Sequence, residues 1–175
     1  MFRRTVVLGV AATAVVLGGT GVASSTTGGH HRTQPGTAAA PAVDLHLVAN
    51  SETAAPGTEA TITLRIGNKG TAPTKEEATV QVVTPFYTSL GKKAPKTCKA
   101  TPAAPTPPLP QTVKCTVPAG IKPKGDTKVA VPLLVAKEAP RGTLAGAALV
   151  TPATKEPDAF PGDNLAAFSL LVLGG

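Results

Sequence analysis

Short runs of alternating apolar and polar residues dominate the chain beyond its first quarter, and Pro, Gly, Asn and Asp separate them. In the first run, Val43, Leu45 and Leu47 would share one face of an extended strand, with Asp44 and His46 on the other. This two-residue period is that of a half-buried β-strand, whereas a helix requires a period near 3.6. Such runs, divided by turn residues every eight to fifteen positions, predict a β-sandwich or barrel.

Seven strands are predicted, and two of them have a special character. Pro132 lacks the N–H that a sheet ladder uses, so its strand is expected at an edge or at a bulge. The last strand is apolar on both faces and is the best candidate for a central position. The chain has no Trp and only one Tyr, and this scarcity of large side chains disfavours a helical bundle. The predicted strands span 43–47, 61–66, 78–84, 112–117, 128–135, 143–150 and 165–173.

The N-terminal quarter has the pattern of a secretory signal. Arg3 and Arg4 precede an apolar run at 5–17, and small residues follow it. That run is too short to span a bilayer, which takes roughly 20 apolar residues. Small residues suit cleavage after Ala23 or after Ser25. We predict a signal peptide at 1–23, a flexible linker rich in Gly, Ser and Thr at 24–41, and one folded domain at 42–175.

The mature chain is expected to carry no membrane anchor. Its cysteines lie far from either cleavage position, so a lipid-modified N-terminal cysteine is not expected. No long apolar span or sorting signal is seen near Gly175. The protein is therefore expected to be secreted to the extracellular space, with any cell-wall association non-covalent.

The two cysteines, Cys98 and Cys115, are separated by 16 residues in a chain predicted to reach an oxidising compartment. A disulfide is the expected outcome. A redox pair would have the closer CxxC spacing, and a metal site would need more ligands. Closing a loop of this size stabilises a fold by about 3 kcal/mol in the chain-entropy model.

The order of these signals resembles that of a known family. The turn 55–57, the Gly-Asn-Lys-Gly turn at 67–70, the pair Cys98 and Cys115, and Asp-Asn at 163–164 before the last strand follow one another as in the bacterial conserved-repeat domain of unknown function. They are similar also to the related cell-adhesion-related bacterial domain. The resemblance implies an all-β, immunoglobulin-like, seven-stranded antiparallel sandwich with one intradomain disulfide, used as a structural or adhesive module and not as an enzyme.

No catalytic constellation is recognisable. His46 is the only histidine of the predicted domain, and none of the domain's serines stands in a Gly-x-Ser-x-Gly elbow. His30 and His31 lie in the linker without further ligands. No cofactor and no metal are therefore predicted, apart from a weak calcium candidate.

That candidate is the loop before the last strand. Asp158, Asp163 and Asn164 offer oxygen atoms of the kind that calcium prefers. The loop lacks the charge density of an EF-hand, and a solvated turn is the alternative.

A lysine-rich segment is the strongest charge asymmetry of a chain whose formal net charge is +7. It could attract a polyanion such as teichoic acid, an acidic polysaccharide or extracellular DNA. Specific nucleic-acid reading is not expected because the segment has no stacking aromatic residue, and without Arg it has no bidentate phosphate ligand. The alternative is that these are solubilising loop lysines. The segment contains one acidic residue, Asp126, and eight lysines: Lys92, Lys93, Lys96, Lys99, Lys114, Lys122, Lys124 and Lys128.

These features together predict a secreted, monomeric, non-enzymatic module for structural or adhesive interaction at the bacterial cell envelope. Its partner is expected to be a protein or a cell-wall polymer. The alternative is a polyanion-binding protein that uses the lysines of segment 92–128. An enzyme or inhibitor would need a site that the sequence does not display.

Overall fold

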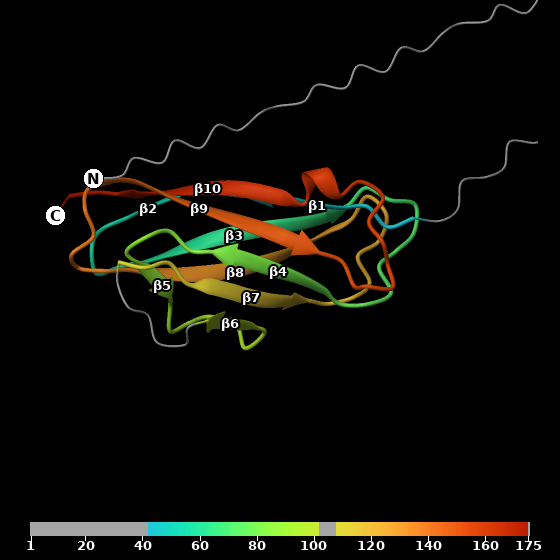
Figure 1. Ribbon diagram of the computed structural model, residues 1–175, viewed down its shortest axis with the longest axis horizontal. Helices are drawn as coiled ribbons and strands as arrows, with labels where there is room; N and C mark the ends of the chain where they lie inside the picture. Colours follow the sequence, from blue (N-terminus) through green and yellow to red (C-terminus); the bar gives the residue numbers. More distant parts are fainter. Residues whose placement is uncertain (1–41, 102–107, 175) are drawn as a thin grey trace, which may run out of the picture. The chain divides into compact units, whose positions relative to one another are not determined.

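A computed structural model describes residues 42–101 and 108–174, and within these ranges the chain forms ten strands and one short 3-10 helix (Figure 1). The predicted signal peptide and linker lie outside the described residues. In the described ranges no helix is both long and apolar enough to cross a membrane. The elements are β1 (Leu45–Ala49), β2 (Glu52–Ala54), β3 (Glu59–Asn68), β4 (Ala78–Val83), β5 (Thr88–Leu90), β6 (Cys98–Thr101), β7 (Thr112–Val117), β8 (Asp126–Val135), β9 (Gly142–Thr151), η1 (Pro161–Asp163) and β10 (Leu165–Val172).

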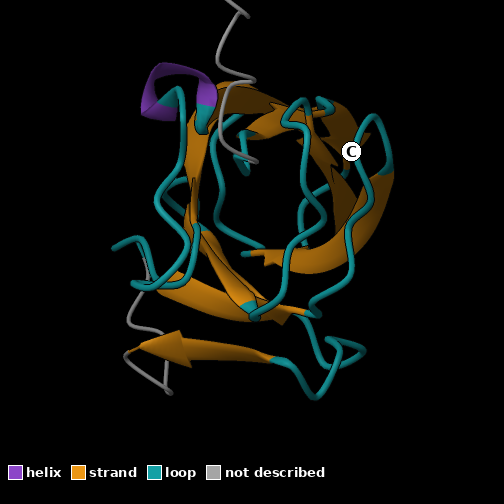
Figure 2. Ribbon diagram, turned by 90° about the vertical axis from the view of Figure 1, so that its right-hand side faces the viewer, coloured by secondary structure: helices purple, strands orange, loops and turns teal. Residues whose placement is uncertain are grey.

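The strands form two sheets. One has four strands in the order β1-β3-β8-β5, and the other has six in the order β2-β10-β9-β4-β7-β6. The pairings between described strands are antiparallel, except that β2 runs parallel to β10. Seen along the long axis, the two sheets enclose the core between them (Figure 2). The predicted all-β sandwich is thus confirmed.

The core comes from the two-residue alternation. In β7, for example, Val113, Cys115 and Val117 are fully buried while the residues between them face outward. A second, smaller cluster lies around Val135 and Leu170. Burying side chains of this size contributes about 1.5–3 kcal/mol each, which is the main stabilisation of such a domain. The main cluster includes Leu45, Leu47, Ile62, Leu64, Ile66, Val80, Val82, Val113, Cys115, Val117, Val131, Leu133, Val150 and Phe168.

The seven predicted strands correspond to seven of the observed ones. The three that the sequence did not predict are β2, β5 and β6, which have only three or four residues each and thus no detectable alternation. The central position predicted for the last strand is wrong: β10 lies second from the edge, and β9 and β4 occupy the middle. Its apolar residues on the second face, Leu165 and Leu171, are exposed.

Pro132 lies in β8 just before the part of this strand that pairs with β5. β5 pairs only with the last three residues of β8, starting at Leu133. The Pro132 carbonyl accepts a hydrogen bond from Gly91 N–H (2.8 Å), on the side away from β3. Because the nitrogen and oxygen of one strand residue point to the same side, the missing N–H costs no bond to β3. The N-terminal half of β8 is therefore a sheet edge, as the proline predicted.

Candidate interaction surface

The face of the six-stranded sheet that points away from the core, here called the outer face, changes character across its width. The strand register aligns Leu165 of β10, Leu149 of β9, Gln81 of β4, Lys114 of β7 and Lys99 of β6 in one row. Residues paired across neighbouring strands point to the same side of a sheet. The outer face is therefore apolar over β10 and β9 and cationic over β7 and β6.

The apolar half exposes four large side chains. Leu165 is 64% exposed, Val83 is 43% exposed, and Leu149 and Leu171 are each 42% exposed. They belong to β10, β9 and β4, three adjacent strands. Leu165 and Leu149 are register partners and Val83 pairs with Ala147, so these three lie together, whereas Leu171 pairs with Thr143 toward the other end of β10. Contiguous apolar side chains on a surface are typical of contact sites, whereas single ones are ordinary. This half is suited to contact with another molecule.

The basic half contains a groove of about 510 Å³. Lys99 and Lys114 face each other directly across the β6–β7 ladder, and Lys96 lies at the turn before β6. No carboxylate lines the groove, and none of the three lysines has an ion-pair partner among the described residues. The other lining residues are Thr79, Thr97, Thr101, Cys115 and Thr116.

A disulfide lies on the inner side of the same two strands. Cys98 and Cys115 are register partners, their Cα atoms are 4.0 Å apart, and their sulfurs are bonded. The predicted disulfide is thus confirmed. It ties the edge strand β6 to β7, and it stands next to Lys99 and Lys114 in the sequence of each strand. The backbone that carries the two facing lysines is therefore held covalently.

The other five predicted lysines lie elsewhere. Lys128 belongs to β8 in the opposite sheet and is paired with Arg65, whose guanidinium forms an ion pair with Asp126. The eight lysines therefore do not form one surface, because neighbours in the sequence were carried to different sheets and loops. The remaining lysines, all in turns or loops, are Lys92, Lys93, Lys122 and Lys124.

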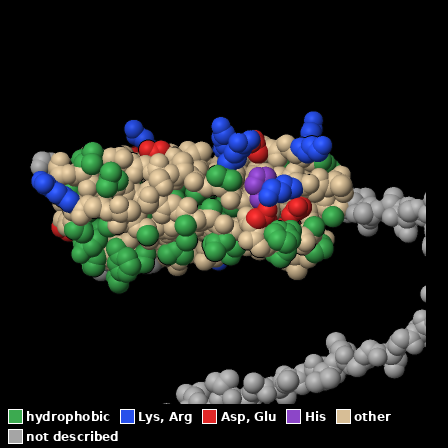
Figure 3. Space-filling model, turned by 90° about the horizontal axis from the view of Figure 1, so that it is seen from above, with side chains coloured by type: hydrophobic (Ala, Val, Ile, Leu, Met, Phe, Trp, Pro, Cys, Tyr) green, Lys and Arg blue, Asp and Glu red, His purple; other side chains and the backbone are tan. Residues whose placement is uncertain are grey.

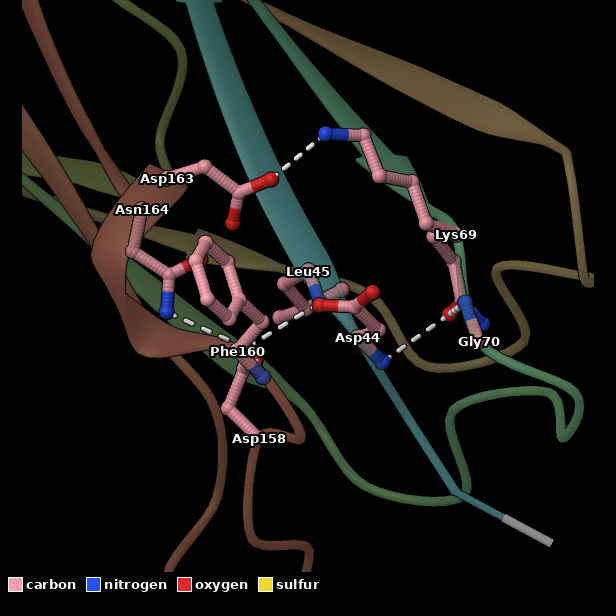
Figure 4. Close-up of polar contacts among 9 residues, drawn as sticks. Asp44, Leu45, Lys69, Gly70, Asp158, Phe160, Asp163 and Asn164 are labelled. Atoms are coloured by element: carbon pink, nitrogen blue, oxygen red, sulfur yellow. Dashed lines mark hydrogen bonds and ion pairs between the residues drawn. The ribbon is translucent and has the colours of Figure 1, made fainter.

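The loop before β10 is the weak calcium candidate. Its Asp158 carboxylate accepts hydrogen bonds from other groups of the protein (Figure 4). Its Oδ2 accepts hydrogen bonds from Leu45 N–H (3.0 Å) and from the Asn164 side-chain amide (3.1 Å). Its Oδ1 accepts one from Phe160 N–H (2.9 Å). Asp158 thus joins the loop to the start of β1.

Two residues that the sequence did not connect with this loop complete the cluster. Lys69 Nζ lies 2.5 Å from Asp163 Oδ2, and this hydrogen bond raises the pKa of Lys69. Burial, followed by the charges of Asp163 and Asp158, raises the pKa of Asp44. Figure 3 shows acidic and basic side chains gathered around the histidine. Asp44 lies more than a hundred residues from the loop, and no local pattern could have revealed the contact.

Calcium binding at Asp158 and Asp163 stays a prediction. Buried oxygen atoms of Asp44, Asp163 and Asn164 have no hydrogen-bond partner. Yet in the described part of the chain no three His, Cys, Asp or Glu side chains are grouped so that they would hold a metal ion.

His46 packs against the backbone of β3. It pairs with Gly67, where a Cβ atom would collide with the imidazole ring. A neighbouring cavity of about 370 Å³ is lined, among the described residues, by amide and charged groups but by no hydroxyl or thiol nucleophile. Ser51 and Ser169 hydrogen-bond to each other (2.9 Å). The cavity is lined by His46, Arg65, Asn68, Lys69, Lys124, Gly125 and Asp126.

The two packed sheets and their connections define a chain with the fold of the CARDB domain. Of the solved structures that resemble it, the CARDB domain of a Pyrococcus furiosus protein, solved in complex with di-metal ions, has a TM-score of 0.50 and 16% identity over 77% of this chain and 97% of that chain. The seventh ScaB type I cohesin of Pseudobacteroides cellulosolvens has a TM-score of 0.48 and 10% identity over 75% of this chain and 94% of that chain.

A protein that catalyses macrocyclization in alchivemycin A biosynthesis is also among the matches, with a TM-score of 0.42 and 11% identity over 76% of this chain and 89% of that chain. No family model matches the sequence, and no curated protein matches it either. A shared fold does not decide between binding and catalysis, so function has to be argued from the surfaces described above.

Proposed function

We propose that this protein is an exported, non-enzymatic β-sandwich module that makes structural or adhesive contacts at the bacterial cell envelope. The observation that carries the proposal is the outer face of the six-stranded sheet, where Val83, Leu149, Leu165 and Leu171 are exposed on three adjacent strands. Exposed apolar side chains on a sheet face of this kind offer contact area for a partner.

Export is supported by two independent features. The basic start, the short apolar run and the small residues that follow are typical of a cleaved signal. The disulfide between Cys98 and Cys115 is typical of proteins that fold in an oxidising compartment.

Export is tested by expressing the full chain with a C-terminal tag in a bacterium that secretes proteins. We expect the tagged product in the medium, or in the wall fraction and eluted by salt, with an N-terminus at Ser24 or Thr26. An uncleaved product that stays inside the cell contradicts the proposal.

Contact through the outer face is tested with purified mature protein and isolated envelopes of the bacterium that encodes it. Leu149→Glu places a charge directly beside Leu165 in the apolar half, and we expect at least tenfold weaker retention. The matched control is Val48→Glu, because Val48 is 53% exposed and lies in β1 of the four-stranded sheet. Equal retention of the Leu149 variant and the wild type contradicts a contact here.

A further inference from the structure

We infer that the basic half of the outer face binds a linear polymer of phosphodiesters that has no stacked rings, with Lys96, Lys99 and Lys114 as the cationic ligands. This inference rests on the proposed interaction function and names the chemistry of the partner. It narrows the lysine-rich segment to the three lysines that the fold brings to one groove.

The first argument is the unfavourable placement of two charges. Lys99 and Lys114 are direct cross-strand partners, and like charges in such a position destabilise a sheet. Lysine on an edge strand protects against strand addition, which would account for Lys99 on β6. It does not account for Lys114, because β7 is paired on both sides, with β4 and β6. A bound anion would neutralise both charges at once.

The second argument is the donor chemistry of the groove. Three ammonium groups and the hydroxyl groups of Thr79, Thr97, Thr101 and Thr116 line it, and no carboxylate competes for them. Ammonium and hydroxyl donors suit an oxygen-rich anion. Lysine acts on phosphate as a point charge, without the planar matching that arginine provides.

The third argument concerns the shape of the anion. The groove spans β4, β7 and β6, so it crosses three strands that lie roughly 4.8 Å apart. The three charges are spread over β7, β6 and the turn before β6, which suits a chain of anionic groups better than a single small ion. No aromatic side chain lines the groove, so neither sugar rings nor nucleic-acid bases find a stacking platform. A flexible phosphodiester backbone without rings fits these limits.

The experiment measures the binding of fluorescently labelled poly(glycerol phosphate) to purified mature protein by anisotropy. The test variant is Lys96→Gln/Lys99→Gln/Lys114→Gln, and the matched control is Lys122→Gln/Lys124→Gln/Lys128→Gln, which removes the same charge from other places. We expect the test variant to bind at least tenfold more weakly and the control to bind within threefold of the wild type. All six substitutions are at exposed positions, and thermal melting checks that both variants stay folded.

Salt provides a second readout. If three phosphates are contacted, a fourfold rise in salt should weaken wild-type binding by about 18-fold, since the logarithm of affinity falls by roughly 0.7 per contact for each tenfold rise in salt, as for single strands. The test variant should lose nearly all of this dependence. An unchanged salt dependence in the test variant overturns the inference.

Three further outcomes also overturn it: no binding by the wild-type protein, an equal loss in both triple variants, or equal or tighter binding of a polyuronate or of single-stranded DNA. The envelope assay with the Leu149 variant leaves these three lysines in place. If the polymer fails to bind while that assay still shows retention through the apolar half, the partner assignment fails and the proposed function stands.

Discussion

Phe168 of β10 lies directly opposite Gly146 of β9, and its ring covers the glycine backbone where a Cβ atom would otherwise be. Phe168 is only 4% exposed, so its ring has little room to move away. We expect Gly146→Ala to lower the free energy of unfolding by about 1–3 kcal/mol, as is typical of overpacking. Denaturant unfolding measures this, and Phe168→Leu in the same protein should recover part of the loss. A Gly146→Ala variant of wild-type stability would contradict the close contact.

The facing pair Lys99 and Lys114 predicts a stabilising substitution. Lys99→Gln should raise the free energy of unfolding by about 0.2–1 kcal/mol in low salt, because it removes a like-charge contact. The gain should shrink in 1 M salt, where charges are screened within roughly 3 Å. Thermal unfolding at both salt concentrations measures the effect. Lys93→Gln is the control, since Lys93 lies in a turn and faces no cation across a ladder.

Removing the disulfide should weaken the fold. We expect Cys98→Ala/Cys115→Ala to lose about 3 kcal/mol of unfolding free energy, since the bond closes a loop of 17 residue steps. Urea unfolding measures this, and reduced wild-type protein should behave like the double variant. Two thiols that titrate in the native, unreduced protein would contradict the bond.

Asn68 holds three backbone segments together. Its Oδ1 accepts hydrogen bonds from Asp44 N–H (3.2 Å) and Gly70 N–H (2.9 Å), and its amide donates to Ala72 O (2.7 Å) and Ile121 O (3.0 Å). Asn68 is 1% exposed, so Asn68→Ala leaves buried groups unpaired and should cost about 3 kcal/mol. Chemical denaturation measures the loss. Asn68→Asp keeps the acceptor and should lose less at low pH; the idea fails if Asn68→Ala is neutral.

Asp44 should make stability depend on pH. Its pKa is raised in the native state, so the native state binds the proton more tightly than the unfolded state does. The stability that this contributes is present below the ordinary pKa of 3.8 and is lost as the pH rises through the raised native value. Asp44→Asn should therefore raise the melting temperature at pH 7 and flatten its dependence above pH 4. A lower melting temperature at pH 7 would contradict this reasoning.

Alternation and turn chemistry predicted most of the sandwich, because each long strand buries one face. The prediction for 112–117 matches the observed bounds of β7. The position of β10 was wrong because Leu165 and Leu171 look like core residues in the sequence but lie on the outer face. Apolar character alone does not tell a second buried face from an exposed contact surface.

The candidate site was harder to predict than the fold. The lysines of segment 92–128 were grouped by sequence, yet Lys128 lies on the other sheet. The facing pair was accessible in principle: if Cys98 and Cys115 are bonded across an antiparallel ladder, Lys99 and Lys114 must be opposite each other. No disulfide or other sequence signal connects segments that are distant in sequence, such as those of Asp44 and Asp158, so their contact could not be predicted in this way.

The sheet edge at Pro132 affects how copies of the domain can contact each other when they are crowded together. Pro132 has no N–H, so an extended peptide that paired with this part of β8 would lack a hydrogen bond of the ladder. Lys128, four positions earlier on the same unpaired part of β8, would place a charge beside that peptide. Copies of the domain gathered densely along one anionic chain would therefore not join one another through this part of β8.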